Sequence, residues 1–413
     1  MRNLIVVYVI FFMVYTEEST YFDCKIYRLK PKNNQQLAVL TKFKNNTHIR
    51  FLSSVSFSKK PIDVMVHPQA QDIFTWTLNL HRIQYKVLQY NVKTIAEPIK
   101  FMHMQTSAPN CEISFSQFNR FDKINGYLDQ LAQDYADIAI VELIGESYER
   151  RDMKVIQISS NPNVSKPINF VDAGIHAKEW IGPAMALYII NQLVENSEQE
   201  YLLDYVDWHI LPVMNPDGYE YSHDYDRSWR KTRSPQKKCI GTDLNRNFDF
   251  HWGENGSSSD PCSDAYSGPY AFSEIETQNV KTYMEKWKNR IKLYVTFHSY
   301  GNYILYPWGY TSTLPDNEAE LQNLAKKVNT AIVHAGGEEY DFGTTTNVLY
   351  AAAGDSKDWA RGMLGIELTY TIELPGAGLM GFDPDPTQII PIVEQTFPGI
   401  EVFGQYIAKK FGI

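Results

Sequence analysis

A histidine and a carboxylate lie three residues apart near the middle of the chain. The strand-like segment 167–173 leads into His176 and Glu179, and a helix-like stretch from about 181 to 195 follows. Both side chains can turn toward one point, and both are ligand types that Zn²⁺ accepts. Taken alone, this short pattern favours another interpretation, in which a loop histidine caps the helix and Glu179 lies in its first turn. Residues further along the chain change that balance.

Two more strand ends carry residues of the same kind. The strand-like segment 291–297 is followed at once by His298, and the strand-like segment 365–374 contains Glu373 near its end. Together with His176 and Glu179, His298 completes a set of three ligands that leaves a fourth position for water, as in catalytic zinc sites. A carboxylate beside such a water can act as a general base, and Glu373 is a candidate for this role. Individually, His298 can equally be a buried core histidine, and Glu373 a carboxylate at a solvent-facing sheet edge.

Two arginine-containing segments, 228–233 and 242–248, lie between these residues in the sequence. Their guanidinium groups offer a fork geometry that suits a carboxylate or a developing oxyanion. Basic clusters are most often solvated surface. Residues 111–413, however, carry 25 Lys and Arg against 42 Asp and Glu, a net charge of −17. Clustered arginine is therefore less expected as plain surface here.

The length and ends of the chain indicate an exported protein of two or three domains. Its 413 residues exceed one ordinary domain. Arg2 followed by the apolar run 4–15 is typical of a secretory signal, and we assign residues 1–16 to it. We find no later run long enough to cross a membrane, so we expect a secreted, extracellular protein that spans no membrane. An exported route favours disulfides among the four cysteines.

Residues 17–100 form a small unit with its own pattern. Strand-like and helix-like stretches follow one another as βαββαβ, which fits a small α+β open sandwich. The segment 17–110 carries 13 Lys and Arg against 6 Asp and Glu, a net charge of +7. This opposite charge predicts that it docks on the acidic body, with 101–112 as a linker. We exclude nucleic acid as a partner, because the basic residues are spread out rather than clustered.

The remainder, 113–413, alternates strands and helices. This pattern predicts one α/β domain with a mixed, mostly parallel sheet and helices on both faces. In such sheets, sites form at the carboxyl ends of strands, where the histidines lie. The expected strands cover 138–144, 154–159, 168–173, 206–214, 291–297 and 365–374, and the expected helices cover about 116–135, 181–195, 273–289, 316–335 and 388–409.

The motifs, in this order and spacing, resemble the zinc carboxypeptidases of the pancreatic A and B type, which are made as secreted proenzymes. The motifs that carry the resemblance are Gly-Ile-His-x-x-Glu-Trp, Trp-Arg-Lys-Thr-Arg-Ser, Asn-Arg-Asn-Phe, His-Ser-Tyr and a glutamate in the last strand. The resemblance covers nearly the whole chain and implies a zinc carboxypeptidase-like fold behind an activation domain.

The resemblance also implies a role for each matching residue. It implies one Zn²⁺ per chain held by His176, Glu179 and His298, with Glu373 as general base and Arg230 polarising the scissile carbonyl. It further implies that Asn245 and Arg246 grip the free C-terminal carboxylate, that Lys178 makes a secondary contact to this carboxylate, that Tyr350 closes over the substrate, that Ser299 and Tyr300 line neighbouring subsites, and that Cys239 and Cys262 form a disulfide. Cys24 and Cys111 stay open: they are either free or paired across the domain boundary.

Two positions depart from the family pattern, and three glycines match an unrelated motif. Lys178 stands where arginine is usual, which keeps the charge but loses the fork. Gly376, Gly378 and Gly381 formally match a dinucleotide-binding fingerprint, but no helix follows them. Lys357 aligns with the residue at the base of the side-chain pocket and predicts a preference for acidic C-terminal residues, glutamate above aspartate. The alternative is that Lys357 pairs with a neighbouring aspartate and the pocket stays apolar or mixed.

We therefore predict a secreted zinc exopeptidase precursor that removes single C-terminal residues from peptides. A trypsin-like endoprotease would activate it, for example after Lys100, and we expect a monomer. Two rival hypotheses are the same enzyme with apolar specificity and a catalytically inactive secreted binding protein on this fold. The complete set of ligands, base and Arg230 argues against the second.

Overall fold

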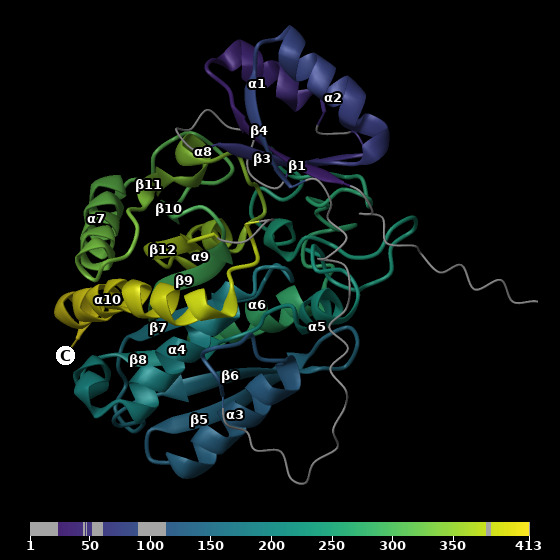
Figure 1. Cartoon of the computed structure of the whole chain (residues 1–413). Helices are drawn as coiled ribbons and strands as arrows, with labels where there is room; N and C mark the ends of the chain where they lie inside the picture. The colour runs from purple at the N-terminus through teal and green to yellow at the C-terminus, as the bar shows by residue number, and fades with distance from the viewer. Residues whose placement is uncertain are drawn as a thin grey trace, which may run out of the picture.

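A computed structural model describes residues 24–43, 46, 48–51, 61–89, 113–376 and 381–412. These form a small N-terminal sheet domain and a larger domain beneath it (Figure 1). The predicted signal segment, the predicted linker, Lys100, Cys111 and Gly378 lie outside the described residues. Within the described residues, no helix has both the length and the apolar character needed to cross a membrane.

A mixed sheet of eight strands forms the centre of the larger domain. The strands are β5 (Ala139–Glu146), β6 (Asp152–Ile158), β7 (Ile168–Ala173), β8 (Asp207–Leu211), β9 (Ile291–Ser299), β10 (Tyr303–Tyr306), β11 (Asp341–Thr344) and β12 (Leu368–Leu374). They lie in the order β11-β10-β12-β9-β7-β8-β6-β5. The four central strands β12, β9, β7 and β8 run parallel, whereas β10, β6 and β5 pair antiparallel with their inner neighbours.

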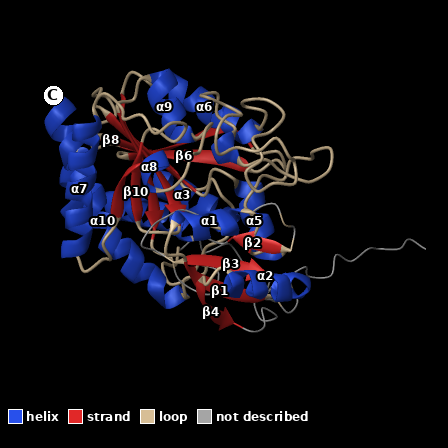
Figure 2. Cartoon of the chain, turned by 90° about the horizontal axis from the view of Figure 1, so that it is seen from above, coloured by secondary structure: helices blue, strands red, loops and turns tan. Residues whose placement is uncertain are grey.

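Helices cover both faces of this sheet (Figure 2). On one face lie α3 (Phe121–Asp134), α4 (Ile181–Glu195), α7 (Glu318–His334) and α10 (Pro386–Phe411), and on the other lie α6 (Ile275–Trp287) and α9 (Ser356–Leu364). Successive residues of a strand point to opposite faces, so Leu293 and Val295 of β9 join the first cluster while Tyr294 joins the second. The central strands are apolar on both sides for this reason.

The predicted fold class is confirmed, and several elements were not predicted. Strands β7 and β9 and helix α4 begin where the periodicity placed them. The unpredicted elements are β10, β11, α5 (Pro216–Asp224), α8 (Thr345–Val348) and α9. They are short, so their apolar residues do not repeat often enough to reveal a period.

The small domain also packs on both faces of its sheet. Its elements are β1 (Lys25–Lys30), α1 (Asn34–Thr41), β2 (Ile49–Phe51), β3 (Ile62–Val66), α2 (Pro68–Leu80) and β4 (Gln84–Gln89), with strand order β2-β3-β1-β4, all antiparallel. Tyr27 and Val64 pack against the two helices. Ile26 and Met65 point the other way and join a cluster with Tyr300 and Phe382 of the larger domain. Every residue of β3 is buried as a result.

Strand register brings the predicted site residues to one edge of the large sheet. Ala173 of β7 lies opposite Phe297 of β9, so the loop after β7 and the end of β9 emerge side by side. Glu373 of β12 lies directly opposite His298 of β9. Three segments that are far apart in the sequence therefore meet at the carboxyl ends of parallel strands.

Candidate active site

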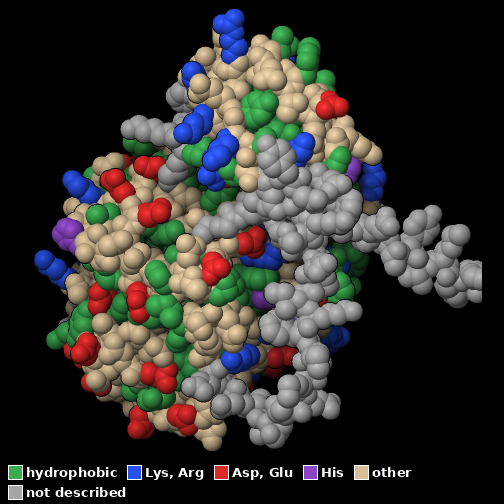
Figure 3. All heavy atoms as spheres, viewed as in Figure 1, with side chains coloured by type: hydrophobic (Ala, Val, Ile, Leu, Met, Phe, Trp, Pro, Cys, Tyr) green, Lys and Arg blue, Asp and Glu red, His purple; other side chains and the backbone are tan. Residues whose placement is uncertain are grey.

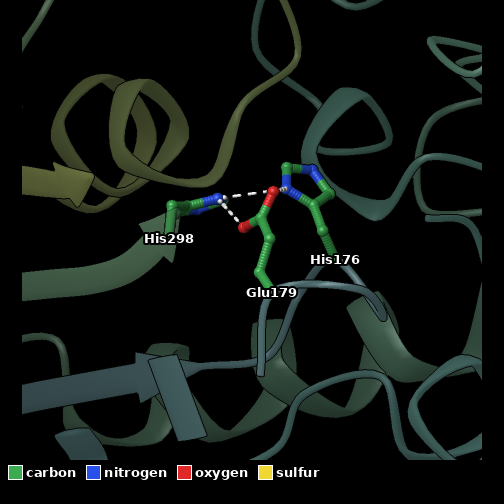
Figure 4. A group of neighbouring side chains, drawn as sticks. All are labelled: His176, Glu179 and His298. Carbon is green, nitrogen blue, oxygen red and sulfur yellow. Dashed lines mark hydrogen bonds and ion pairs between the residues drawn. The ribbon is translucent and has the colours of Figure 1, made fainter. Parts of the chain in front are cut away.

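His176, Glu179 and His298 converge on one point, as Figure 4 shows. Their candidate ligand atoms all lie within 4.8 Å of one another, and all three residues are buried. The Nδ1 atoms of the two histidines are 3.1 Å apart, and the two Glu179 oxygens lie 2.8 Å and 3.1 Å from them. Three electron-pair donors packed this closely, away from water, are suited to a cation.

The donor set fits zinc. Two imidazole nitrogens and one carboxylate are typical of a catalytic zinc site with an open fourth position. When bound, zinc supplies a positive charge that polarises a carbonyl and lowers the pKa of water. The structure thus brings together the three residues that the sequence indicated.

Asp243 lies behind this group, and the sequence analysis gave it no role. Its Oδ1 lies 3.1 Å from Nε2 of His176, so it accepts the ring N–H and leaves Nδ1 for a metal. Its Oδ2 accepts from Nε and Nη2 of Arg230, at 3.0 Å and 2.8 Å. Burial opposes its ionisation, but Arg230 and His176 hold the pKa of Asp243 well below its usual value. In the sequence, the sign that Asp243 belongs to the site is its position two residues before Asn245.

Glu373 projects beside the three ligands from the neighbouring strand. It is partly buried, and the register sets it against His298. Burial, followed by the negative charge of Glu179, raises the pKa of Glu373 above its usual value. A carboxylate with a strengthened affinity for protons, next to a metal-type donor set, has the properties of a general base.

The arginines occupy the loops on the same side. Arg230 is held by Asp243 and lies 3.8 Å from Glu179. The Nε of Arg246 donates to the Gly256 carbonyl at 2.9 Å and its Nη1 to the Asn245 carbonyl at 2.7 Å. Tyr350 is 38 % exposed, with its ring 6.0 Å from the Arg246 guanidinium. A buried, oriented guanidinium beside an accessible tyrosine can bind an anion that enters from solvent.

Asn245 links the segment that carries Arg246 to the start of α9, which carries Lys357. Its side-chain oxygen accepts from the Ser356 amide at 3.0 Å, and its own amide donates to Asp243 at 3.0 Å. The disulfide Cys239–Cys262 is formed close by in sequence, as the resemblance implied. These links join the metal-type group, the arginines and the pocket into one rigid frame.

Tyr300 and Lys178 lie where the small domain contacts the larger one. The Tyr300 ring packs edge-on against Phe382 at 5.0 Å, and the Lys178 ammonium lies 4.5 Å from that ring. A methyl group at Gly376 or Gly381 would come within 2.4 Å or 2.0 Å of the Tyr300 ring. Gly376 and Gly381 therefore leave room for the Tyr300 ring. This accounts for two of the three glycines that match the dinucleotide-binding fingerprint.

Ser299 is the last residue of β9 and is buried. Its amide donates to Glu179 at 3.3 Å, so it helps to orient a predicted metal ligand.

Lys357 is fully enclosed at the start of α9. Its ammonium donates to Asp355 at 2.5 Å and to Asp358 at 2.9 Å. This pairing is the alternative that the sequence allows. Burial opposes ionisation, but the two carboxylates raise the pKa of Lys357 above its usual value, so the ammonium stays charged.

Two family models match the chain. The model described as zinc carboxypeptidase matches residues 124–399, and the model described as carboxypeptidase activation peptide matches residues 27–97. The chain belongs to the zinc carboxypeptidase family. It is an enzyme of that family, and an activation peptide precedes the enzyme domain in the chain.

Similar proteins agree with this assignment. Carboxypeptidase B of Astacus astacus is 45 % identical over 303 residues, covering 72 % of this chain and all of that protein. Zinc carboxypeptidase A 1 of Drosophila melanogaster is 36 % identical over 403 residues, covering 94 % of this chain and 92 % of the relative. The crystal structure of carboxypeptidase A from Helicoverpa armigera superposes with a TM-score of 0.87 at 30 % identity, covering 95 % of this chain and 99 % of that one.

Proposed function

We propose that this protein is a secreted proenzyme, and that its active form binds one Zn²⁺ and removes single C-terminal residues from peptides. The carrying observation is the buried group of His176, Glu179 and His298 with Glu373 next to it in register. We assign the three ligands to zinc and general-base work to Glu373. In this role Glu373 takes a proton from the attacking water and delivers it to the leaving amine.

Arg230 would stabilise the oxygen on which negative charge develops. Asp243 holds its guanidinium on one side, so the group is oriented before substrate arrives and costs no reorganisation during the reaction. The same carboxylate orients His176. One buried aspartate therefore positions both a metal ligand and the oxyanion-binding arginine.

Restriction to the chain end would come from Asn245 and Arg246. A buried guanidinium needs an anion, and in a peptide only the terminal carboxylate supplies one at that point. Tyr350 would close over the bound residue, because its ring lies at the accessible edge of the Arg246 site. Ser299, Tyr300 and Lys178 would line the path of the preceding residues.

The activation segment would keep the enzyme inactive until a protease, which we propose to be trypsin-like, cuts the chain. Ile26 and Met65 pack against Tyr300 and Phe382, at the rim of the proposed subsites. Figure 3 shows Lys and Arg side chains gathered on the small domain and Asp and Glu spread over the larger one. We propose 17–100 as this segment, 101–112 as the linker, 113–413 as the catalytic part, a signal peptide at 1–16, and a monomer.

A substitution in this contact tests the inhibitory role. Met65→Glu places a charge in the apolar contact, which should loosen the segment and raise the activity of the uncut chain on a folded protein substrate. Trp76→Glu on the exposed face of α2 is the matched control. Equal activity of the uncut wild type and the trypsin-treated chain would contradict the proposal.

We further propose that the pocket favours an acidic C-terminal residue, glutamate first. Support comes from the buried ammonium of Lys357, which has a third N–H to donate beyond its two bonds to aspartates. An apolar side chain there leaves a buried donor unused. The names of these relatives include both A and B types, so they do not decide this point.

The decisive assay compares kcat/KM for blocked dipeptides that end in Glu, Gln, Phe or Arg, with trypsin-treated full-length protein. The order Glu, Gln, Phe, Arg is expected, with all activity lost on zinc chelation and restored by zinc. Best cleavage of Phe would establish the apolar alternative, and no cleavage of any substrate would favour an inactive binding protein.

A further inference from the structure

One cation and two carboxylates lie buried together at the start of α9. Lys357 donates to Asp355 and Asp358, and the side chains retain 1 %, 4 % and 0 % of their exposed surface, respectively. All three groups are therefore almost completely withdrawn from solvent. Gly309 packs against the pair: a methyl group there would lie 2.5 Å from Oδ2 of Asp355 and 3.1 Å from Nζ of Lys357.

The two aspartates are held differently. Asp358 accepts the backbone amides of Gly309 and Tyr310 with Oδ2, at 2.7 Å and 3.2 Å, so its carboxylate is part of the loop's structure. Asp355 uses Oδ1 to cap α9 by accepting the Asp358 amide at 2.8 Å. Oδ2 of Asp355 is bound to Lys357. Each aspartate thus gives one oxygen to the backbone and the other to the ammonium, but Asp355 has the shorter bond to Lys357, 2.5 Å against 2.9 Å, and accepts one backbone amide where Asp358 accepts two.

Lys357 and the two aspartates lie next to Asn245, a residue that we propose binds the C-terminal carboxylate. Ser356, between Asp355 and Lys357, donates its amide to Asn245. A C-terminal residue whose carboxylate is held at Asn245 and Arg246 would therefore project its side chain toward this group.

We propose that Asp355 is a specificity-determining residue: it is a built-in counter-ion that competes with the substrate for Lys357 and limits how strongly the pocket selects C-terminal glutamate. This inference rests on the proposed function, with Lys357 at the base of the side-chain pocket, and not on which residue the wild type prefers. With Asp355 ionised, a substrate carboxylate must share the ammonium with a like charge a few ångströms away. At short range in a buried site such repulsion is large enough to offset most of the attraction.

The test neutralises Asp355 without removing the helix cap. Asp355→Asn keeps the shape and the capping oxygen, and Asp355→Ser is a second variant that also caps helices well. Each should raise the ratio of kcat/KM for Glu over Phe dipeptides about tenfold, which corresponds to about 1.4 kcal/mol. Asp316→Asn is the control, because Asp316 is exposed and pairs with Arg361. Arg361 lies on α9, as Lys357 does, but away from the pocket.

A double-mutant cycle shows whether the effect runs through the ammonium. In a Lys357→Met background, Asp355→Asn should leave the Glu-to-Phe ratio unchanged, because no cation remains to compete for. Zinc content and activity on an Ala dipeptide check that the folded site is intact in each variant.

The outcomes separate the two proposals. A ratio that stays within twofold in folded Asp355→Asn and Asp355→Ser overturns the role of Asp355, even if wild type prefers Glu. A tenfold rise in a protein whose wild type prefers Phe supports the role of Asp355 and overturns the acidic preference. A similar rise in the Lys357→Met background also overturns the counter-ion role.

Discussion

Two clusters of buried charged residues lie in the catalytic domain, and they stabilise buried charge in different ways. The metal-type cluster brings the ligand atoms of His176, Glu179 and His298 within 4.8 Å of one another, close enough to hold an added cation. The pocket cluster encloses its own cation, Lys357, between Asp355 and Asp358. Buried charges are stable only when paired or bound to metal, and the two clusters represent the two options.

The difference shows which cluster can be altered without loss of the reaction. In the function that we propose, residues of the metal-type cluster act on the bond being cut, whereas residues of the pocket cluster select the side chain that enters. Substitutions in the first should therefore change the turnover of every substrate. Substitutions in the second should change stability and the ranking of substrates.

The largest effect is expected for Glu373→Gln. The amide keeps the shape but cannot accept a proton, so kcat should fall by about 10²–10⁴-fold for all dipeptides alike. Zinc content measured on the same samples should equal that of wild type. Turnover within tenfold of wild type, with zinc bound, would remove Glu373 from the role of base.

A smaller effect is expected when the pocket cluster loses its cation. Lys357→Met leaves two buried carboxylates facing each other, which should lower the free energy of unfolding by about 3–5 kcal/mol. Adding Asp355→Asn should recover at least half of this loss, since one of the two charges is then gone. Urea unfolding of the four proteins in the cycle measures both, and a fully additive cycle would argue against the pairing.

Asp243→Asn should weaken zinc binding without abolishing it. Outer-shell carboxylates that hold a ligating histidine typically change metal affinity by about 10–100-fold. Competition with a chelator gives the affinity, and Asp226→Asn, an aspartate that caps Ser228 outside the cluster, is the control. An unchanged affinity would assign Asp243 to orienting Arg230 alone.

The sequence predicted the metal-type cluster better than the pocket cluster for a physical reason. His176, Glu179 and His298 follow strands β7 and β9, whose apolar runs are easily recognised, and parallel strands end at one edge of a sheet. Lys357 was recognised as unusual. The sequence leaves its pairing open, because Asp355 and Asp358 on either side can turn toward it or away. Which way they turn depends on where α9 begins, and the sequence pattern does not predict this short helix.

The same limit applies elsewhere in the chain. Asp243 lies in a loop, where no periodicity indicates which way a side chain points. The contact of Met65 with Phe382 joins residues more than 300 positions apart and depends on how two domains dock. The charge difference between the segments predicted that they dock but not through which residues.

A third buried histidine, His209 of β8, shows how the sheet treats a histidine without a metal-type partner set. Its Nδ1 accepts from the Tyr283 hydroxyl at 2.7 Å. Burial, followed by the positive charges of Arg290 and Lys286, lowers the pKa of His209 to about 3. Between the ordinary value of about 6.5 and this lower value the unfolded chain binds a proton that the native protein does not, so stability falls as pH falls.

This gives the smallest of the expected effects. Replacing His209 with Gln removes the titrating group, so the variant should lose about 1 kcal/mol less stability than wild type between pH 7 and pH 5.5. Urea unfolding at the two pH values measures the difference, and His334→Gln on the exposed side of α7 is the control. If wild type and His209→Gln lose the same stability, His209 is protonated in the native protein. The sheet would then hold a buried charged imidazole, which its burial beside Arg290 and Lys286 argues against.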